Sequence, residues 1–120
     1  MDVSNRSEAL LLRLLSASAR RGEVIASNVA NQNTPGYVRR TLRFEEALAA
    51  ALRDGRTDPL AVEPEIREDR ATPARPDGNN VDAELEANAL RENRLLYEAY
   101  ASILQGHYAL LKGAITGGQA

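Results

Sequence analysis

Apolar and small residues recur at alternating intervals of four and three near the start of the chain, and this spacing constrains the fold most strongly. An α-helix turns once every 3.6 residues, so the spacing collects these side chains into one stripe, as in the seam of a coiled coil. The pattern predicts a helix from Ser7 to about Asn31, with Ser18 keeping the stripe thin enough for a close neighbour. The other stripe members are Leu11, Leu15, Gly22, Ile25 and Val29.

The last third of the chain repeats this pattern over a longer span. It predicts one helix from about Val81 to Ile115, with Asn80 or Asp82 as the cap at its start and Gly117-Gly118 at its end. The main apolar positions of its stripe are Leu90, Tyr97, Ala101, Leu104, Tyr108, Leu111 and Ile115.

The segment between the two stripes has a different composition. Residues 44–52 suit a short helix, whereas residues 53–80 hold four of the five prolines and many charges, which is typical of an irregular linker. Within the linker, Leu60–Glu68 allows a brief strand or two. The expected fold class is all-α, with two long amphipathic helices packed as a coiled-coil-like pair or bundle and joined by the short helix and a Pro-rich, partly extended linker.

At 120 residues the chain has room for one assembly unit. We expect an N-terminal helix in residues 1–33, a turn and short helix in 34–52, the linker in 53–80 and a C-terminal helix in 81–120. A pair of helices covers only one side of each apolar stripe, so the pattern predicts that other chains bury the rest. The alternative is that the middle segment folds over the helices and completes a small monomeric bundle.

Charge and composition exclude several classes of function. Residues 1–44 carry a net charge of +4 and residues 45–86 a net charge of −7, so these parts are expected to attract each other or their counterparts on neighbouring copies. There is no Cys and a single His, which argues against a metal site, and no apolar run approaches the roughly 20 residues needed to span a bilayer. The short apolar run near the start also fits a secretory signal poorly.

Catalytic and nucleic-acid-binding patterns are weak. The carboxylate pairs Glu45-Glu46, Glu68-Asp69 and Glu84/Glu86 have no His or phosphate-binding loop beside them, so we expect solvated faces and helix-start charges. We assign no catalytic residue, cofactor or small-molecule substrate. The basic cluster Arg39, Arg40 and Arg43 lacks interleaved aromatics, so an acidic protein surface is a better partner for it than nucleic acid.

The stretch ASNVANQNTPGYVRR follows directly on the first apolar stripe. Thr34 to Tyr37 places Pro35 and Gly36 at the two central positions of a type II turn, so the chain is expected to stop its helix and turn there. Asn28, Asn31 and Asn33 suit exposed or left-handed positions near a helix end. A helix stop and a turn leave unexplained why three asparagines crowd this helix end.

The whole stretch resembles the N-terminal signature of the flagellar axial proteins, the family of rod, hook and hook-associated subunits. That signature is a helix ending in Asn-hydrophobic-Ala-Asn, then a short Asn/Asp segment, then Thr-Pro-Gly-Tyr and a basic residue. Val38 stands where the family commonly has Lys. The matching positions are Asn28, Ala30, Asn31, Asn33, Thr34, Pro35, Gly36, Tyr37 and Arg39.

A second string, DGNNVD, is similar to the start of the C-terminal region in one proximal rod subunit of that family. A sibling rod subunit shares the first motif but usually enters its last helix through an Asn-Val-Asn type of sequence. The two resemblances together cover about two thirds of the chain, and the central segment matches little. The matching positions of the second string are Asp77, Gly78, Asn79, Asn80, Val81 and Asp82.

The resemblance implies a structural subunit of the proximal rod in the flagellar basal body, which assembles through its terminal helices into a helical rod that transmits torque. Implied partners are other copies of the chain, other rod and basal-body proteins, and the flagellar type III export apparatus. The implied place is the rod in the periplasmic space, reached without a cleaved signal peptide. The alternatives are the sibling proximal rod subunit and a small cytoplasmic helical adaptor or chaperone, which the heptad pattern alone supports equally well.

Overall fold

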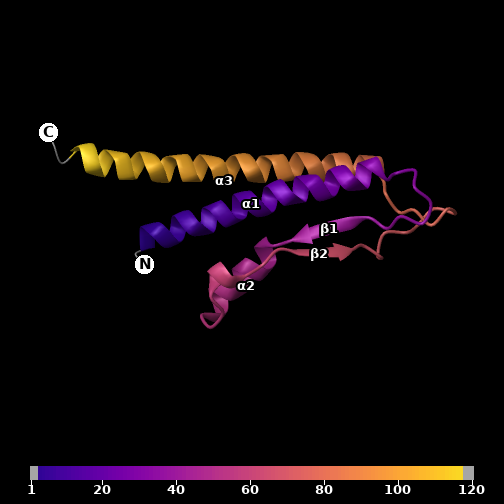
Figure 1. Ribbon diagram of the computed structural model, residues 1–120, viewed down its shortest axis with the longest axis horizontal. Helices are drawn as coiled ribbons and strands as arrows, with labels where there is room; N and C mark the ends of the chain where they lie inside the picture. The colour runs from indigo at the N-terminus through magenta and orange to yellow at the C-terminus, as the bar shows by residue number, and fades with distance from the viewer. Residues whose placement is uncertain (1–2, 118–120) are drawn as a thin grey trace.

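Two long antiparallel helices span the molecule in the computed structural model, which describes residues 3–117 (Figure 1). Helix α1 covers Val3–Ala30 and helix α3 covers Ala83–Gly117, and the two pack along each other as the sequence predicted. Between them come strand β1 (Arg40–Arg43), helix α2 (Glu45–Asp54), the 3-10 turn η1 (Pro59–Ala61) and strand β2 (Glu65–Glu68). The fold is therefore mostly helical with a small two-stranded ribbon.

The molecule is a thin, elongated plate. Helix α3, helix α1 and the strands with α2 lie in three rows side by side, and the overall dimensions are 68 × 32 × 15 Å (Figure 1). Its radius of gyration is 18.5 Å, whereas a compact chain of this length has about 14 Å. Its accessible surface of 7943 Å² likewise exceeds the roughly 6,400 Å² expected for a monomer of this mass. The fold thus leaves much more surface uncovered than a globular domain does.

The ends of α3 follow from local chemistry. The Asp82 carboxylate accepts a hydrogen bond from the Glu84 backbone N–H at 2.9 Å, so Asp82 is the cap at its N-terminus. Asn80, the other predicted cap, is buried and bonds elsewhere. The helix runs to Gly117 at its far end, and Gly118, which was predicted to help end it, lies outside the described residues.

The two strands form an antiparallel pair in which Leu42 lies opposite Ile66. Sequence patterning predicted a strand within Leu60–Glu68 but not β1, since four residues are too few to show alternation clearly. Leu42 points into the protein and is buried, whereas Ile66 is about half exposed. The ribbon therefore covers α1 through one strand only.

The hydrophobic core lies between α1 and the middle segment. Phe44 is its largest fully buried apolar side chain. The middle segment therefore folds onto one side of α1, as the alternative of a monomeric bundle required, but it leaves much of α3 uncovered. The core consists of Ala17, Leu42, Phe44 and Leu48, with Leu10, Leu14, Val24 and Val62 packed against it.

Ion pairs join the basic first part of the chain to its acidic middle. Arg21 forms an ion pair with Glu45 at 2.6 Å and Arg13 forms one with Glu63 at 3.4 Å. Arg13 also bonds the Val62 carbonyl and lies over the Phe44 ring at 5.8 Å. The attraction expected from the uneven charge distribution is thus realised within one chain. These pairs hold the ribbon and α2 against α1.

Candidate assembly site

The predicted turn at Thr34 to Tyr37 is present. The Tyr37 N–H donates to the Thr34 carbonyl at 3.2 Å, and Gly36 has a φ of 76°, in the left-handed region that favours glycine. The turn redirects the chain from the end of α1 toward β1. It lies at the end of the plate where α3 begins (Figure 1).

Asn28 was expected at an exposed or left-handed position, and the structure contradicts this, since its side chain is fully buried. The amide donates to the Arg40 carbonyl at 2.8 Å and accepts from the Arg40 N–H and the Tyr37 hydroxyl, both at 2.9 Å. No described residue other than glycine has a positive φ. An asparagine suits this helix end because its amide satisfies backbone groups of the incoming strand.

Glu86 lies in the first turn of α3, as expected for a helix-start charge, but the expectation of a solvated side chain is wrong, because this side chain is completely buried. It accepts from Arg39 Nε at 2.6 Å and from Asn28 Nδ2 at 3.3 Å. A buried carboxylate requires such partners, since its desolvation is costly. Arg39, expected to face an acidic partner protein, is thus turned inward to its own chain.

Arg39 also bonds Asp69 at 2.6 Å, which completes a largely buried cluster of three charged groups. Burial alone lowers the pKa of the Arg39 guanidinium, but hydrogen bonds to Glu86 and Asp69 outweigh it and raise that pKa above its ordinary value. A hydrogen bond from the Thr72 hydroxyl is the main cause that lowers the pKa of Asp69 well below its usual range, and a hydrogen bond from Arg39 is the second. Both shifts favour the charged forms of Arg39 and Asp69, and the bonds of Arg39 tie the linker, the turn and α3 together.

The two strings singled out in the sequence dock on each other. Asn79 is fully buried, and its amide donates to the carbonyls of Asn31 and Thr34 at 2.8 Å each. The Gly36 N–H donates to the Asp77 carbonyl at 2.8 Å. Asn80 accepts from the Arg39 N–H at 2.7 Å and donates to the Asp69 carbonyl at 2.6 Å. We call this group of contacts, from Asn28 to Arg39 and from Asp69 to Glu86, the motif corner.

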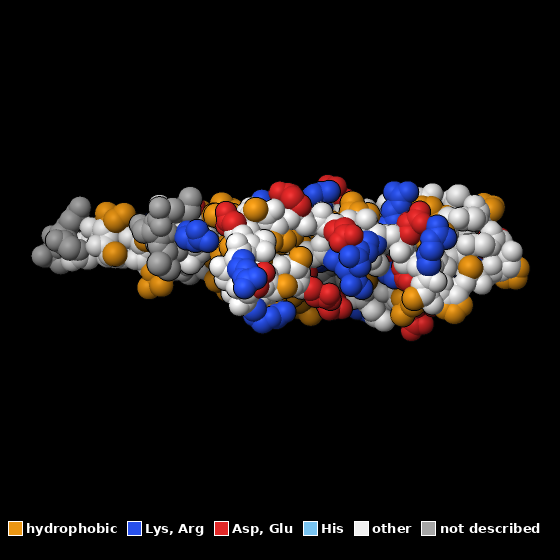
Figure 2. All heavy atoms as spheres, turned by 90° about the horizontal axis from the view of Figure 1, so that it is seen from below, with side chains coloured by type: hydrophobic (Ala, Val, Ile, Leu, Met, Phe, Trp, Pro, Cys, Tyr) orange, Lys and Arg blue, Asp and Glu red, His pale blue; other side chains and the backbone are white. Residues whose placement is uncertain are grey.

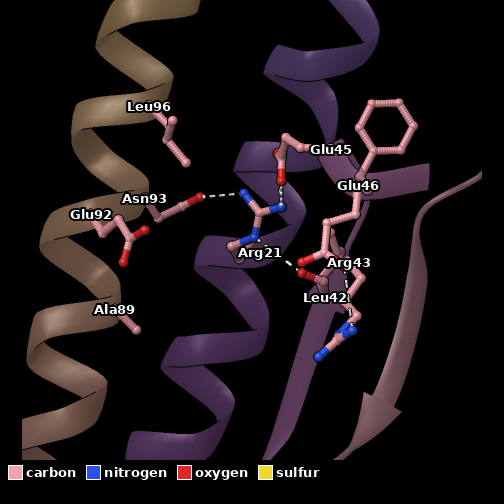
Figure 3. Close-up of a pocket in the computed structure, with 10 residues that line it drawn as sticks. Arg21, Leu42, Arg43, Glu45, Glu46, Ala89, Glu92, Asn93 and Leu96 are labelled. Atoms are coloured by element: carbon pink, nitrogen blue, oxygen red, sulfur yellow. Dashed lines mark hydrogen bonds and ion pairs between the residues drawn. The ribbon is translucent and has the colours of Figure 1, made fainter. Parts of the chain in front are cut away.

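A second polar cluster lies halfway along the helix pair. Asn93 of α3 accepts from the Ser18 hydroxyl at 3.1 Å and from Arg21 Nη1 at 3.0 Å, and donates to the Ser18 carbonyl at 2.9 Å. A Cβ at Gly22 would lie 3.6 Å from the Asn93 amide nitrogen, which is an ordinary van der Waals distance, so the helices are close here but an alanine would also fit. Arg21 continues the cluster to Glu45 (Figure 3).

A cleft of about 230 Å³ lies over this second cluster, between α3 and the start of α2. Arg21 reaches across it from α1, with Asn93 on one side and Glu45 on the other (Figure 3). Tyr100 lies one turn further along α3 than Leu96 of the cleft wall. Burial is the main cause that raises the pKa of Tyr100, and the charge of Glu45 adds to it. Because the polar groups along the cleft bond one another, we interpret the cleft as a groove between packed elements.

The predicted packing residues of α1 divide into buried and partly exposed positions. Ile25 is buried against the rest of the chain, Leu11, Leu15 and Gly22 are half-buried, and Val29 is exposed. The stripe is therefore covered by its own chain most completely around Ile25 and not at Val29. Whether other subunits cover the remainder stays a prediction.

The predicted packing residues of α3 are mostly exposed. Leu104 is buried and Ala101 half-buried, while Leu90 is 49% and Tyr97 45% exposed. Toward the C-terminus, Tyr108 is exposed although its hydroxyl donates to Glu8 at 2.8 Å. Leu111 and Ile115 are exposed as well. The helix thus presents a row of apolar side chains that its own chain leaves open.

Sequence reasoning missed how polar the contact between the two long helices is. Glu86, Asn93 and Asp69 were not among the expected site residues, although all three lie in the two polar clusters. A signal was present, since Glu86 and Asn93 are seven residues apart and therefore share one side of α3. Polar residues at such spacing usually indicate a solvated helix face, so the pattern alone did not predict that these residues are buried.

Other kinds of site find no support among residues 3–117. The described residues contain no cluster of His, Cys, Asp and Glu able to hold a metal ion, and none of their helices is long and apolar enough to cross a membrane. On the face that carries the strands and α2, basic and acidic side chains alternate rather than forming one basic surface (Figure 2). The polar clusters and open helix faces are thus the features that need a functional explanation.

Comparison with known proteins supplies that context. The family model described as "Flagella basal body rod protein" matches residues 15–37, the end of α1 and the turn. The flagellar basal body rod protein FlgB of Escherichia coli (strain K12) is 31% identical over 84% of this chain and 83% of its own length. FlgB of Bacillus subtilis (strain 168) is 30% identical over 81% and 83%, and FlgB of Borrelia hermsii 28% identical over 90% and 94% of the two chains.

These relatives align with nearly the whole chain, including the middle segment that the motif resemblance did not cover. They favour the rod subunit over the sibling subunit and the adaptor, and a structural role over an enzymatic one. The chain belongs to the FlgB family of flagellar basal body rod proteins.

Proposed function

We propose that this rod subunit assembles through the open apolar side chains of its two long helices, and that the motif corner sets the geometry of those helices. The carrying observation is the exposure of Leu90, Tyr97 and Ile115 on one side of α3, next to a buried polar contact with α1. Large apolar side chains in rows on a monomer mark surfaces that another protein covers.

The partners in this proposal are other copies of the chain and other rod and basal-body proteins. Contacts between unlike surfaces that do not close a ring generate a helical assembly, which matches a rod. The thin plate supports this arrangement, because helices in one layer expose both broad faces to neighbours. Long helices locked at one end by buried charges also suit a part that transmits torque.

The proposed place is the proximal rod in the periplasmic space, reached through the flagellar type III export apparatus. This part of the proposal rests on the family resemblance. Export is tested by following the chain in cells that lack the export apparatus. Its appearance in the periplasm of those cells would contradict the proposed route.

The main experiment deletes the gene in the source bacterium and complements it with variants of the full chain. Leu90→Glu and Ile115→Glu place charges on exposed positions, so we expect folded protein, no rod in the purified basal bodies and no motility. Arg56→Glu, in the exposed segment after α2, is the matched control and should restore rods. Electron microscopy of purified basal bodies reads the result. Normal rods with both α3 variants would show that the proposed surface is not needed for assembly.

A further inference from the structure

Two lanes of side chains run along α3, each with a spacing of seven residues. The polar lane holds Glu86 and Asn93, followed by Tyr100. The apolar lane lies four residues further on, with Leu90 and Tyr97, followed by Leu104. Four residues of an α-helix turn it by about 40°, so a small rotation of α3 about its axis exchanges one lane for the other.

Hydrophobicity alone favours the apolar lane against α1, and the sequence pattern predicted that α1 would cover one side of it. In the structure, the polar lane faces α1 over the first half of α3. Glu86 and Asn93 are buried, while Leu90 and Tyr97 are almost half exposed. Of the three residues of the apolar lane, only Leu104 is buried. Some specific contact must therefore hold α3 in this rotation.

Two sets of hydrogen bonds provide that contact. Asn93 makes three bonds, two to Ser18 and one to Arg21, with distances of 2.9 to 3.1 Å. Glu86 bonds Arg39 and Asn28. A rotation that buried Leu90 and Tyr97 would break both sets and leave a carboxylate and an amide without partners in the interior, which is costly.

We infer that Asn93 and Glu86 are specificity-determining residues that fix the rotation of α3 and so keep Leu90 and Tyr97 from being buried by their own chain. Polar groups in helix seams are known to select one register at the expense of stability. The use of the open lane by neighbours rests on the proposed function, but the rotation itself does not. A measurement on the purified chain therefore separates the two.

The chain contains no tryptophan, so Tyr97→Trp provides a single fluorescent reporter on the apolar lane. We expect its emission to be that of a partly exposed indole that iodide quenches. Adding Asn93→Leu should shift the emission to shorter wavelength and reduce the quenching, because α3 then turns its apolar lane toward α1. Leucine could overpack against Gly22, so Asn93→Ala, which only removes atoms, is a second variant. It should also shift the emission to shorter wavelength and reduce the quenching.

Two controls make the result specific. Leu95→Trp reports from a position turned by about 200° from Asn93 and should not change when Asn93 is replaced. The exchange Ser18→Asn with Asn93→Ser restores a polar pair and should return the Tyr97→Trp reporter to its exposed state. Circular dichroism verifies that each variant is folded.

Unchanged emission from the Tyr97→Trp reporter in folded Asn93→Leu and Asn93→Ala proteins would overturn the inference, because apolar packing would then hold the rotation. A blue shift that grows with protein concentration would also overturn it, since self-association would be covering the indole. A shift independent of concentration, reversed by the exchange, supports it. Rod formation plays no part in these readings.

Discussion

Gly36 and Gly78 touch each other at the motif corner. A Cβ on Gly78 would lie 3.2 Å from the Gly36 Cα, and both residues have a positive φ, of 76° at Gly36 and 86° at Gly78. One glycine comes from each of the two strings found in the sequence. The two strings therefore meet where a Cβ on Gly78 would be too close to the Gly36 backbone, and this contact brings the start of α3 to the end of α1.

Gly78→Ala should destabilise the chain by about 2 kcal/mol or more, because alanine is strained at positive φ and its methyl group presses on Gly36. Gly55→Ala is the matched control, since Gly55 has a φ of 67° with open space around it, and should cost about 1 kcal/mol. Urea unfolding followed by circular dichroism measures both. Equal losses would show that the close approach has no energetic weight.

Glu86→Ala should lower the free energy of unfolding by about 3 kcal/mol, because it leaves the Arg39 guanidinium largely buried without one of its two carboxylates. Glu92→Ala, at an exposed position of the same helix, should change it by no more than about 0.5 kcal/mol. Chemical denaturation of both variants checks the difference. A loss for Glu86→Ala as small as the control would mean that the cluster does not stabilise the fold.

Asp69 should make the chain acid-sensitive. Its pKa is lowered in the folded state, so its contribution to stability is present above the unfolded pKa of about 4 and is lost as pH falls below that value. We expect the stability of the parent protein to fall more steeply with acid than that of Asp69→Asn, with the two curves converging at low pH. Parallel curves in unfolding experiments across this range would contradict the assignment.

Buried and exposed apolar positions of the long helices should respond differently to a charge. Ile25→Asp and Leu104→Asp place a carboxylate in buried sites and should destabilise the isolated chain by about 3 kcal/mol or more as well as abolish rod incorporation. Leu90→Asp should cost about 1 kcal/mol or less and still abolish incorporation. Thermal unfolding and basal-body microscopy compare them. Normal motility with Ile25→Asp or Leu104→Asp would count against the helix contact.

The turn should be needed for assembly because it presents a backbone donor to the second motif. Pro35→Ala together with Gly36→Val places a β-branched residue at a φ of 76° and should break the bond from the Gly36 N–H to Asp77. We expect weakened docking of residues 77–80, seen as faster amide hydrogen exchange there, and loss of rods. Unaltered rod assembly would show that the turn is dispensable.

The sequence by itself determined the helical elements and the turn. Residues spaced by three and four specify a helix locally, so both long helices were predicted to within a few residues, and Pro35-Gly36 specified a turn through its own backbone preferences. The resemblance of two short strings led to the family that the relatives then established. These features depend on near neighbours in the chain, and so pattern and propensity suffice.

Tertiary structure alone decided how the helices face each other and what the asparagines do. Asn28, Asn79, Glu86 and Asn93 are polar, and polarity by itself predicts exposure, yet each is buried because a partner 12 to 75 residues away in the sequence satisfies it. Such partners become neighbours only when the chain folds. Hydrophobic spacing therefore found the stripes of α3, but long-range hydrogen bonds decided which side of the helix meets α1 and which stays open.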